Sequence, residues 1–373
     1  MIIGVPKEIK NHEYRIGLTP AGVKELVVNG HDVIVENNGG ASIGFENEQY
    51  ITAGAKIIDS AAEIFETADM IIKVKEPQPV ECNMLRAGQI LFTYLHLAPD
   101  PQQTELLVAS GATCIAYETV TAAEGGLPLL APMSEVAGRM SIQAGAHALE
   151  KAQGGLGALL GGVPGVAPAK VLIVGGGVVG TQAARMAVGM GADVTILDRS
   201  LPRLRQLDTE FDGRLKTVYS SADAMDKLIV EADLVIGAVL IPGAAAPKLF
   251  TRAHIEMMKK GAVVVDVAID QGGCFETSKA TTHQDPTYVV DDVVHYCVAN
   301  MPGGVARTST MALTNATMPF AVKLANKGAK QALLDDKHLL AGLNVLGGKV
   351  TYKPVADVLG YEYLAPEDAA ASL

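Results

Sequence analysis

The chain has 373 residues, of which 49% are hydrophobic and 19% are charged, and its net charge is −11. This length exceeds what one hydrophobic core usually serves, so we expect two domains. The acidic balance, with Lys and Arg scattered along the chain, argues against nucleic-acid binding.

The four cysteines form no CxxC pair and indicate reduced thiols in a cytoplasmic protein. The first residues lack the basic and apolar regions of a secretory signal. The apolar stretch Gly154–Gly180 contains Pro164, Pro168 and Lys170, which disfavour a membrane-spanning helix. Because no membrane-spanning helix is predicted, we expect no membrane partner. No spacing typical of metal ligands is present, so we expect no bound metal.

The first part of the chain alternates short apolar runs with segments of helical periodicity. The helical segments are residues 19–30, 60–68 and 100–110, and the first is capped by Thr19 with Pro20 in its first turn. The apolar runs predict strands over residues 1–6, 32–36, 70–75, 89–96 and 112–118. Strands that alternate with helices pair in parallel through right-handed crossovers, which predicts an α/β unit.

A long helix is expected from about Ser134 to Ala152, and a second α/β series follows it. Another long helix over about Val305–Lys327 leads to a tail that completes the first unit. The strands of the second series are rich in Val, Ile and Leu on both faces, as in a parallel sheet covered by helices. They are predicted over residues 170–177, 193–198, 215–220, 232–240, 261–270 and 296–300.

A glycine motif, Gly175-x-Gly177-x-x-Gly180, directly follows a predicted strand, and Asp198 ends the next strand. A lone motif of this kind is weak evidence, but this complete context is typical of a dinucleotide-binding fold. The three glycines allow a tight turn, approach of the pyrophosphate, and close helix packing, in that order. Asp198 can accept hydrogen bonds from the adenosine ribose and would repel a 2′-phosphate, which favours NAD over NADP, although Arg199 beside it weakens this preference.

These patterns predict an α/β fold with two Rossmann-like domains, each built on a parallel sheet. The substrate domain is discontinuous and comprises residues 1–128 and 306–373. The NAD-binding domain, residues 129–305, is inserted into it.

Ligands of open α/β sheets bind outside the carboxyl ends of the strands. Polar residues at these predicted positions are Arg15, Lys75 and His96 in the first domain and Asp270 and Asn300 in the second. Each taken alone also has a structural explanation, such as a solvated loop charge, a surface ion pair, a core histidine or turn chemistry. Their joint placement favours a functional site.

The run Gly4–Gly30 resembles a signature shared by alanine dehydrogenases and the NAD-binding subunit of nicotinamide nucleotide transhydrogenases. The run Ile173–Asp198 is similar to the second signature of that family. The similarity covers essentially the whole chain, and we place it with the alanine dehydrogenases of the family. Further similar segments are KVKEP, TYLHLA, VAIDQGG and VANMPGGVARTST.

This resemblance implies NAD-dependent oxidative deamination of L-alanine to pyruvate and ammonium, reversible as reductive amination, in a cleft of a homo-hexamer. It implies that Arg15 and Lys75 bind substrate and that His96 and Asp270 are catalytic. The remaining implied contacts are with the cofactor. These residues are Ser134, Gly175, Gly177, Val178, Val179, Gly180, Asp198, Arg203, Ser220, Val239, Leu240, Val267, Ala268, Ile269, Asp270, Lys279, Val298, Ala299, Asn300 and Met301.

Three alternatives remain at this point. The chain could be the soluble NAD-binding subunit of a nicotinamide nucleotide transhydrogenase, a saccharopine-type dehydrogenase with a bulkier amino-acid substrate, or a non-catalytic NAD-sensing module. The joint presence of Arg15, Lys75, His96 and Asp270 favours the alanine dehydrogenase.

Overall fold

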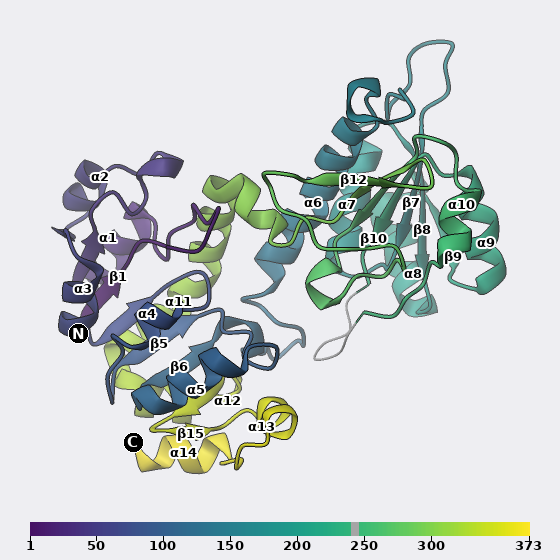
Figure 1. Cartoon of the computed structure of the whole chain (residues 1–373). Helices are drawn as coiled ribbons and strands as arrows, with labels where there is room; N and C mark the ends of the chain where they lie inside the picture. The colour runs from purple at the N-terminus through teal and green to yellow at the C-terminus, as the bar shows by residue number, and fades with distance from the viewer. Residues whose placement is uncertain (240–245) are drawn as a thin grey trace. The chain divides into compact units, whose positions relative to one another are not determined.

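The computed structural model describes residues 1–239 and 246–373, and the predicted site residue Leu240 lies outside them. The chain divides into two compact units (Figure 1). Unit 1 comprises Met1–Met133 and Val305–Leu373, and unit 2 comprises Ser134–Gly304. Each unit contains one sheet flanked by helices, which confirms the predicted α/β fold class with two Rossmann-like sheets.

Unit 1 is built on an eight-stranded sheet with the order β15-β14-β6-β5-β4-β1-β2-β3. The strands β1 to β6 are mutually parallel and cover Ile2–Val5, Asp32–Glu36, Lys56–Ile58, Met70–Ile72, Ile90–Thr93 and Thr113–Ala116. The C-terminal segment adds the antiparallel strands β14 (Leu343–Leu346) and β15 (Lys349–Val350). The last part of the chain therefore extends the same sheet as the first part.

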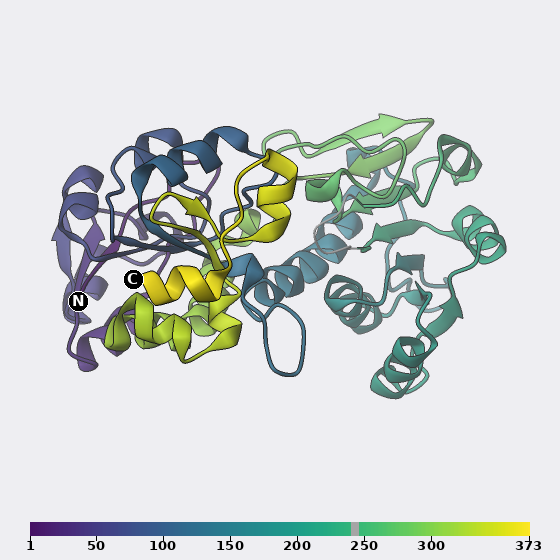
Figure 2. The same ribbon diagram turned by 90° about the horizontal axis from the view of Figure 1, so that it is seen from below.

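The helices of unit 1 cover both faces of this sheet (Figure 2). One face packs against α3 and α5 through an apolar cluster that includes Phe65 and Leu107. On α1, the Thr19 hydroxyl accepts a hydrogen bond from Gly22 N at 3.1 Å, which is the predicted cap. The helices are α1 (Pro20–Val28), α2 (Asn47–Thr52), α3 (Ala61–Thr67), α4 (Pro79–Cys82), α5 (Pro101–Ser110), α11 (Ala306–Leu334), α12 (Lys337–Leu340), α13 (Lys353–Leu359) and α14 (Pro366–Ser372).

Unit 2 contains a seven-stranded sheet with the order β12-β13-β11-β10-β7-β8-β9. All neighbours are parallel except β12, which is antiparallel to β13. The strands β8 and β9 extend the sheet on one side of β7, and β10 and the later strands extend it on the other side. The order therefore reverses at β7, which is the switch point where doubly wound sheets bind ligands. The strands β7 to β13 cover Lys170–Val174, Asp193–Asp198, Lys216–Tyr219, Leu234–Gly237, Val263–Asp266, Thr287–Val290 and Val293–Tyr296.

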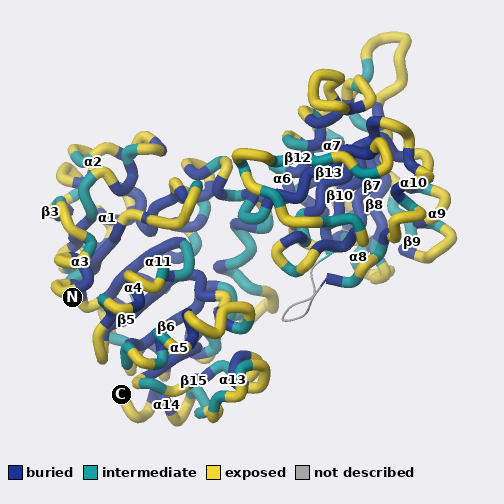
Figure 3. The backbone as a smooth tube through the Cα atoms, in the orientation of Figure 1, coloured by how far each residue is buried: buried dark blue, intermediate teal, exposed yellow. Residues whose placement is uncertain are grey.

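The central strand β7 is buried on both faces because its side chains alternate between two cores. Val171 and Ile173 pack into a cluster with residues of α6, α7 and α8. Leu172 and Val174 pack into a second cluster with residues of α9 and α10. Figure 3 shows the inner strands as buried, whereas the edge strands β9 and β12 have only intermediate and exposed residues. The helices are α6 (Ala131–Ala148), which begins at the end of unit 1, α7 (Val178–Gly189), α8 (Leu201–Phe211), α9 (Ala222–Glu231) and α10 (Arg252–Met257).

The strand predicted over residues 296–300 is wrong, because β13 covers Val293–Tyr296 and only Tyr296 is shared. The polar His295 interrupts the apolar pattern of the strand, yet it is fully buried. Its ring nitrogens lie 2.7 Å from Thr277 Oγ1 and 3.0 Å from Val293 O. Hydrogen bonding to residues of another segment therefore allows a histidine inside the sheet, and the local pattern does not reveal it.

The two long helices also differ from their predicted ends. The first begins at Ala131 and stops at Ala148, and a short 3₁₀ turn, Lys151–Gln153, follows it. The helix α11 continues past Lys327 to Leu334, with a kink at Gly328, where φ is 72°. No helix in the described part of the chain is long and apolar enough to span a membrane.

Candidate active site

The glycine loop between β7 and α7 is shaped by two close backbone approaches. A Cβ on Gly175, whose φ is 105°, would lie 2.6 Å from Ala238 O. A Cβ on Gly180 would lie 1.8 Å from Gly175 O, so only glycine lets α7 pack against this loop. Within the described residues, and apart from Gly177 and its two chain neighbours, no atom lies within 4 Å of a Cβ built on Gly177, which leaves room at the helix N-terminus for a phosphate group.

Asp198 and Arg203 hold the glycine loop from the adjacent strand and helix. Asp198 Oδ2 accepts a hydrogen bond from Gly176 N at 2.7 Å, and Oδ1 accepts one from Ser200 N at 2.7 Å. Arg203 donates from Nε to Gly176 O and from Nη2 to Thr181 Oγ1, both at 2.6 Å. Each carboxylate oxygen has a further lone pair, so Asp198 can still accept from a ribose hydroxyl.

With the exception of Ser134, the other predicted cofactor residues described in unit 2 follow the carboxyl ends of its parallel strands, at the same edge as the glycine loop. Ser220 comes directly after β9, and its N donates to Asp198 O at 2.9 Å. Lys279 is exposed but not isolated, since its Nζ lies 4.5 Å from the centre of the Tyr288 ring. Ser134 lies in the first turns of α6, and Val178 and Val179 begin α7. Val239 follows β10, the run 267–270 follows β11, and the run 298–301 follows β13.

Asp270 is exposed in a 3₁₀ turn, Ile269–Gln271, beyond the end of β11 rather than on the strand. The last residue of β11 is Asp266, which is fully buried. Its carboxylate accepts hydrogen bonds from Ala268 N at 3.1 Å, Cys274 N at 2.8 Å and Ser278 Oγ at 2.5 Å. Asp266 therefore fixes the loop that carries Asp270, a role that the sequence did not suggest.

Asn300 has a left-handed backbone with φ of 62°. It precedes a 3₁₀ turn, Met301–Val305, and its carbonyl oxygen lies 3.0 Å from the His283 Nε2 donor. A residue with a Cβ rarely adopts this conformation, so its backbone is held by its surroundings.

In unit 1, Arg15 is buried with 2% of its side chain exposed and is not a solvated loop charge. Its Nε and Nη2 groups donate to the two carboxylate oxygens of Glu13 at 2.7 and 2.6 Å. Burial lowers the pKa of Arg15, but the hydrogen bonds and charge of Glu13 outweigh it and raise the pKa above its usual value. The site therefore holds a permanent, oriented guanidinium group.

Lys75 follows β4 and is largely buried, with its Nζ 3.4 Å from Glu76 Oε2. Glu76 also pairs with Lys10. Burial by itself would raise the pKa of Glu76, but the charges of Lys75 and Lys10 lower it to about 2. The Lys75 ammonium thus lies beside an ionised carboxylate.

A network of buried charged side chains contacts the backbone of Lys75. The sequence analysis did not predict this network. Lys73 Nζ lies 3.0 Å from Glu8 Oε2 and 2.7 Å from Glu81 Oε1, and its side chain is 0% exposed. Glu8 Oε1 accepts hydrogen bonds from Val74 N at 2.7 Å and Lys75 N at 3.2 Å. Lys73 has apolar neighbours on both sides in the sequence. This pattern could have indicated that Lys73, as well as Lys75, is buried.

His96 follows β5 and is not a core histidine, since 43% of its side chain is exposed. Its backbone is left-handed, with φ of 48°. Its ring stacks on Tyr94 with centres 5.7 Å apart and planes 7° apart, and its Nδ1 lies 3.8 Å from Glu118 Oε1. The exposed ring can therefore exchange protons with a bound molecule.

The structure brings Arg15, Lys75 and His96 to one edge of the sheet in unit 1. They follow β1, β4 and β5, which are neighbours in the order β5-β4-β1 and are mutually parallel. Asp270 belongs to the corresponding carboxyl edge of unit 2, with the glycine loop. Among the described residues, no group of three or more His, Cys, Asp and Glu side chains could hold a metal ion.

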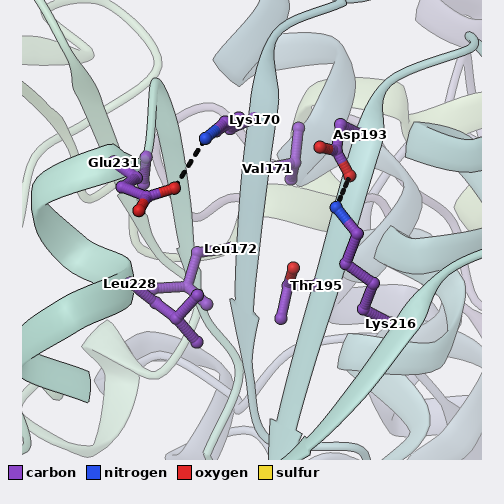
Figure 4. Close-up of a pocket in the computed structure, with 9 residues that line it drawn as sticks. Lys170, Val171, Leu172, Asp193, Thr195, Lys216, Leu228 and Glu231 are labelled. Atoms are coloured by element: carbon purple, nitrogen blue, oxygen red, sulfur yellow. Dashed lines mark hydrogen bonds and ion pairs between the residues drawn. The ribbon is translucent and has the colours of Figure 1, made fainter. Parts of the chain in front are cut away.

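A small pocket of about 100 Å³ lies at the opposite edge of the unit 2 sheet, at the amino ends of β7, β8 and β9 (Figure 4). Its charges pair with each other, because Lys170 Nζ lies 2.6 Å from a Glu231 oxygen and Lys216 Nζ lies 2.5 Å from an Asp193 oxygen. These side chains are exposed to solvent, so the pocket lacks the enclosed polar groups of a binding site.

Comparisons with known proteins agree with this arrangement along the whole chain. Residues 4–137 match the family model of the N-terminal domain of alanine dehydrogenase/PNT, and residues 141–353 match the model of its C-terminal domain. An alanine dehydrogenase of Halomonas elongata is 65% identical over 98% of this chain and 98% of its own length.

Two solved structures have the same fold. One, an L-alanine dehydrogenase, has a TM-score of 0.94 and 52% identity, and the match covers 96% of this chain and 99% of that chain. The other, a transhydrogenase from Sinorhizobium meliloti, has a TM-score of 0.81 and 25% identity, with coverage of 94% and 99%. The chain therefore belongs to the alanine dehydrogenase/PNT family.

Proposed function

We propose that this chain is an L-alanine dehydrogenase that converts L-alanine, water and NAD to pyruvate, ammonium, reduced NAD and a proton, and catalyses the reverse reaction. The observation that carries the proposal is similarity over nearly the full chain to alanine dehydrogenases at 65% and 52% identity, against 25% for the transhydrogenase. Unit 1 is assigned substrate binding and unit 2 is assigned cofactor binding.

Several features of unit 2 support NAD as the cofactor. The open space at Gly177 and the amides of the first turn of α7 fit a pyrophosphate. Asp198, at the end of β8, would accept from the ribose hydroxyls and repel a 2′-phosphate. Asp198 is already engaged with the glycine loop, so we expect it to hold both the loop and the ribose. When bound, NAD accepts a hydride from the substrate Cα.

Arg15 and Lys75, at the carboxyl edge of the unit 1 sheet, are the groups suited to bind the substrate carboxylate. Glu13 holds the guanidinium plane of Arg15 by two hydrogen bonds, so the orientation of this cation is set before substrate binds. Lys75 adds a second positive charge from the next strand in the sheet. In a largely buried site both charges act more strongly on a carboxylate than they would in water.

His96 is assigned the proton transfers. Loss of hydride leaves the iminium form of the substrate, water adds to its carbon, and the resulting carbinolamine collapses to pyruvate and ammonium. An imidazole can take the proton of the attacking water and return it to the leaving nitrogen. General acid–base assistance of this kind is typically worth about 10²–10⁴-fold in rate. Asp270 is assigned stabilisation of the cationic intermediate.

The proposal also includes homo-hexameric assembly and a cytoplasmic location, both supported by the family resemblance. Light scattering of the purified protein measures the assembly. A dimeric mass would contradict the hexamer without affecting the proposed activity.

The test of the function is a panel of amino acids with NAD and with NADP, followed by absorbance of the reduced cofactor. We expect turnover with L-alanine and NAD, little with L-lysine, and little with NADP. Preference for lysine would indicate a saccharopine-type enzyme, and no amino-acid-dependent reduction would favour a transhydrogenase subunit. The variant His96→Ala should lose about 10²–10⁴-fold in kcat while its affinity for NAD stays unchanged.

A further inference from the structure

Glu118 lies beside His96 because of the register of their strands. The parallel strands β5 and β6 pair Thr93 with Ala116, so the residues just beyond each strand end lie at the same level. Glu118 occupies a short 3₁₀ turn, Tyr117–Thr119, directly after β6. Its side chain is 13% exposed and is directed at the segment that carries His96.

The Glu118 carboxylate accepts hydrogen bonds from two consecutive backbone N–H groups, those of Leu95 and His96. Its Oε1 accepts a hydrogen bond from His96 N at 2.6 Å. Leu95 N lies 3.2 Å from both Oε1 and Oε2. His96 has a left-handed backbone and lies outside the strand, and Glu118 provides the acceptor for its N–H group.

The same carboxylate also limits the orientation of the imidazole ring. Its Oε1 lies 3.8 Å from His96 Nδ1, while the ring face stacks on Tyr94. Tyr94 is itself fixed, because its hydroxyl donates to Leu129 O at 2.5 Å and its ring meets that of Tyr117 edge to face. One ring face and the Nδ1 edge are thus defined by the protein, and Nε2 is the nitrogen directed away from the carboxylate.

We propose that Glu118 is a positioning residue for His96, which holds the backbone of the Leu95–His96 segment and favours the imidazole orientation in which Nε2 meets the substrate. The inference rests on the proposed function, since it assumes that His96 transfers protons. Glu118 touches neither substrate nor cofactor in this assignment. It acts through His96 alone.

Glu8 provides a matched comparison within the same unit. It is also a buried carboxylate that accepts two consecutive backbone N–H groups, those of Val74 and Lys75, directly after a strand. Within the described residues Glu8 forms its hydrogen bonds and ion pair with Lys73, Val74 and Lys75 and not with His96, and the residue that it positions is the lysine assigned to substrate binding. Loss of Glu118 should therefore affect proton transfer, whereas loss of Glu8 should affect substrate affinity.

The experiment compares Glu118→Gln, His96→Ala and the double variant, with Glu8→Gln as control. Because a misplaced catalytic group can cost about 10²-fold, we expect Glu118→Gln to lower kcat by about 10–100-fold with little change in KM for alanine or NAD. In the His96→Ala background, Glu118→Gln should cause no further loss, because the residues act as one unit. Glu8→Gln should raise KM for alanine and lower activity by the same factor in both backgrounds.

A purely structural role predicts different results. It would lower the yield of folded protein and would multiply the loss in the His96→Ala background. Equal losses in both backgrounds, or unchanged kcat in Glu118→Gln, would overturn the inference while His96 keeps its role. If His96→Ala retained full turnover, the proton-transfer assignment itself would fail, and the inference with it.

A further variant decides the outcome if the His96→Ala enzyme is too slow to assay. Glu118→Asp keeps a carboxylate as acceptor and should recover part of the kcat lost in Glu118→Gln, with KM for alanine and NAD little changed. No recovery of kcat in Glu118→Asp, together with a raised KM for alanine in Glu118→Gln, would overturn the inference.

Discussion

The buried ammonium of Lys73 provides the sharpest test of how the site is supported. Replacement of Lys73 by methionine keeps a long unbranched side chain, one atom shorter, but removes the cation that joins Glu8 and Glu81. The distances from Nζ to their oxygens are 3.0 and 2.7 Å, and the side chains are at most 3% exposed. The buried carboxylates of Glu8 and Glu81 would then lie close together without a positive charge between them.

The expected cost follows from this burial. Removal of one partner from a buried ion pair typically costs about 3–5 kcal/mol, because the remaining charge is neither solvated nor paired. The backbone donors Val74 N, Lys75 N and Gln78 N remain and moderate the loss. The variant should therefore fold with a free energy of unfolding lower by about 3 kcal/mol at neutral pH.

The loss should also depend on pH. In the native chain burial raises the pKa of Glu8, although Lys73 counteracts this, and removal of Lys73 raises it further. When the pKa of a carboxyl group is higher in the folded chain than in the unfolded chain, the group destabilises the folded chain as pH rises above its pKa in the unfolded chain. The deficit of Lys73→Met should accordingly be smaller near about pH 5 than near about pH 8.

Urea unfolding of native and variant protein at both pH values measures these effects. The triple variant Lys73→Met with Glu8→Gln and Glu81→Gln removes the unpaired charges and should recover much of the loss. Lys170→Met is the matched control, because Lys170 also pairs with a glutamate but on the exposed surface, and it should change little. A loss below about 1 kcal/mol, or one equal at both pH values, would refute the reasoning.

Three further predictions concern other parts of the chain. Gly180→Ala should abolish NAD binding measured by calorimetry, because its Cβ would lie 1.8 Å from Gly175 O; normal binding would mean that the loop relaxes without cost. Arg15→Lys should raise KM for alanine about tenfold or more and leave KM for NAD unchanged, because one of two charge-assisted bonds to Glu13 is lost; steady-state kinetics with equal changes in both would contradict it. Burial lowers the pKa of His295 below its usual 6.5, so the unfolded chain binds this proton at a higher pH than the folded chain. Stability should fall as pH drops below about 6.5, and urea titrations of His295→Gln should show a shallower fall; identical slopes would exclude this histidine as the cause.

Much of the fold could be predicted because its signals are local. The strands β2 and β8 were predicted with their observed ends, and the cap of α1 by Thr19 follows from residues three positions apart. The glycine fingerprint is local in the same sense, since Gly175 and Gly180 approach each other within one turn. The prediction that Arg15, Lys75 and His96 lie at the carboxyl edge of a sheet followed from their positions after predicted strands and from the rule for parallel sheets.

The sequence by itself determined the alternation of strands and helices and the position of the dinucleotide loop, because hydrophobic period and turn geometry depend on residues a few positions apart. Only the tertiary structure decided which charges are enclosed and what they hold. Glu8 reaches Lys73 across 65 positions of chain, and Glu118 reaches His96 across 22. Such partners meet because neighbouring strands end at the same level, so their burial and pairing depend on sheet register, which no local pattern of side chains encodes.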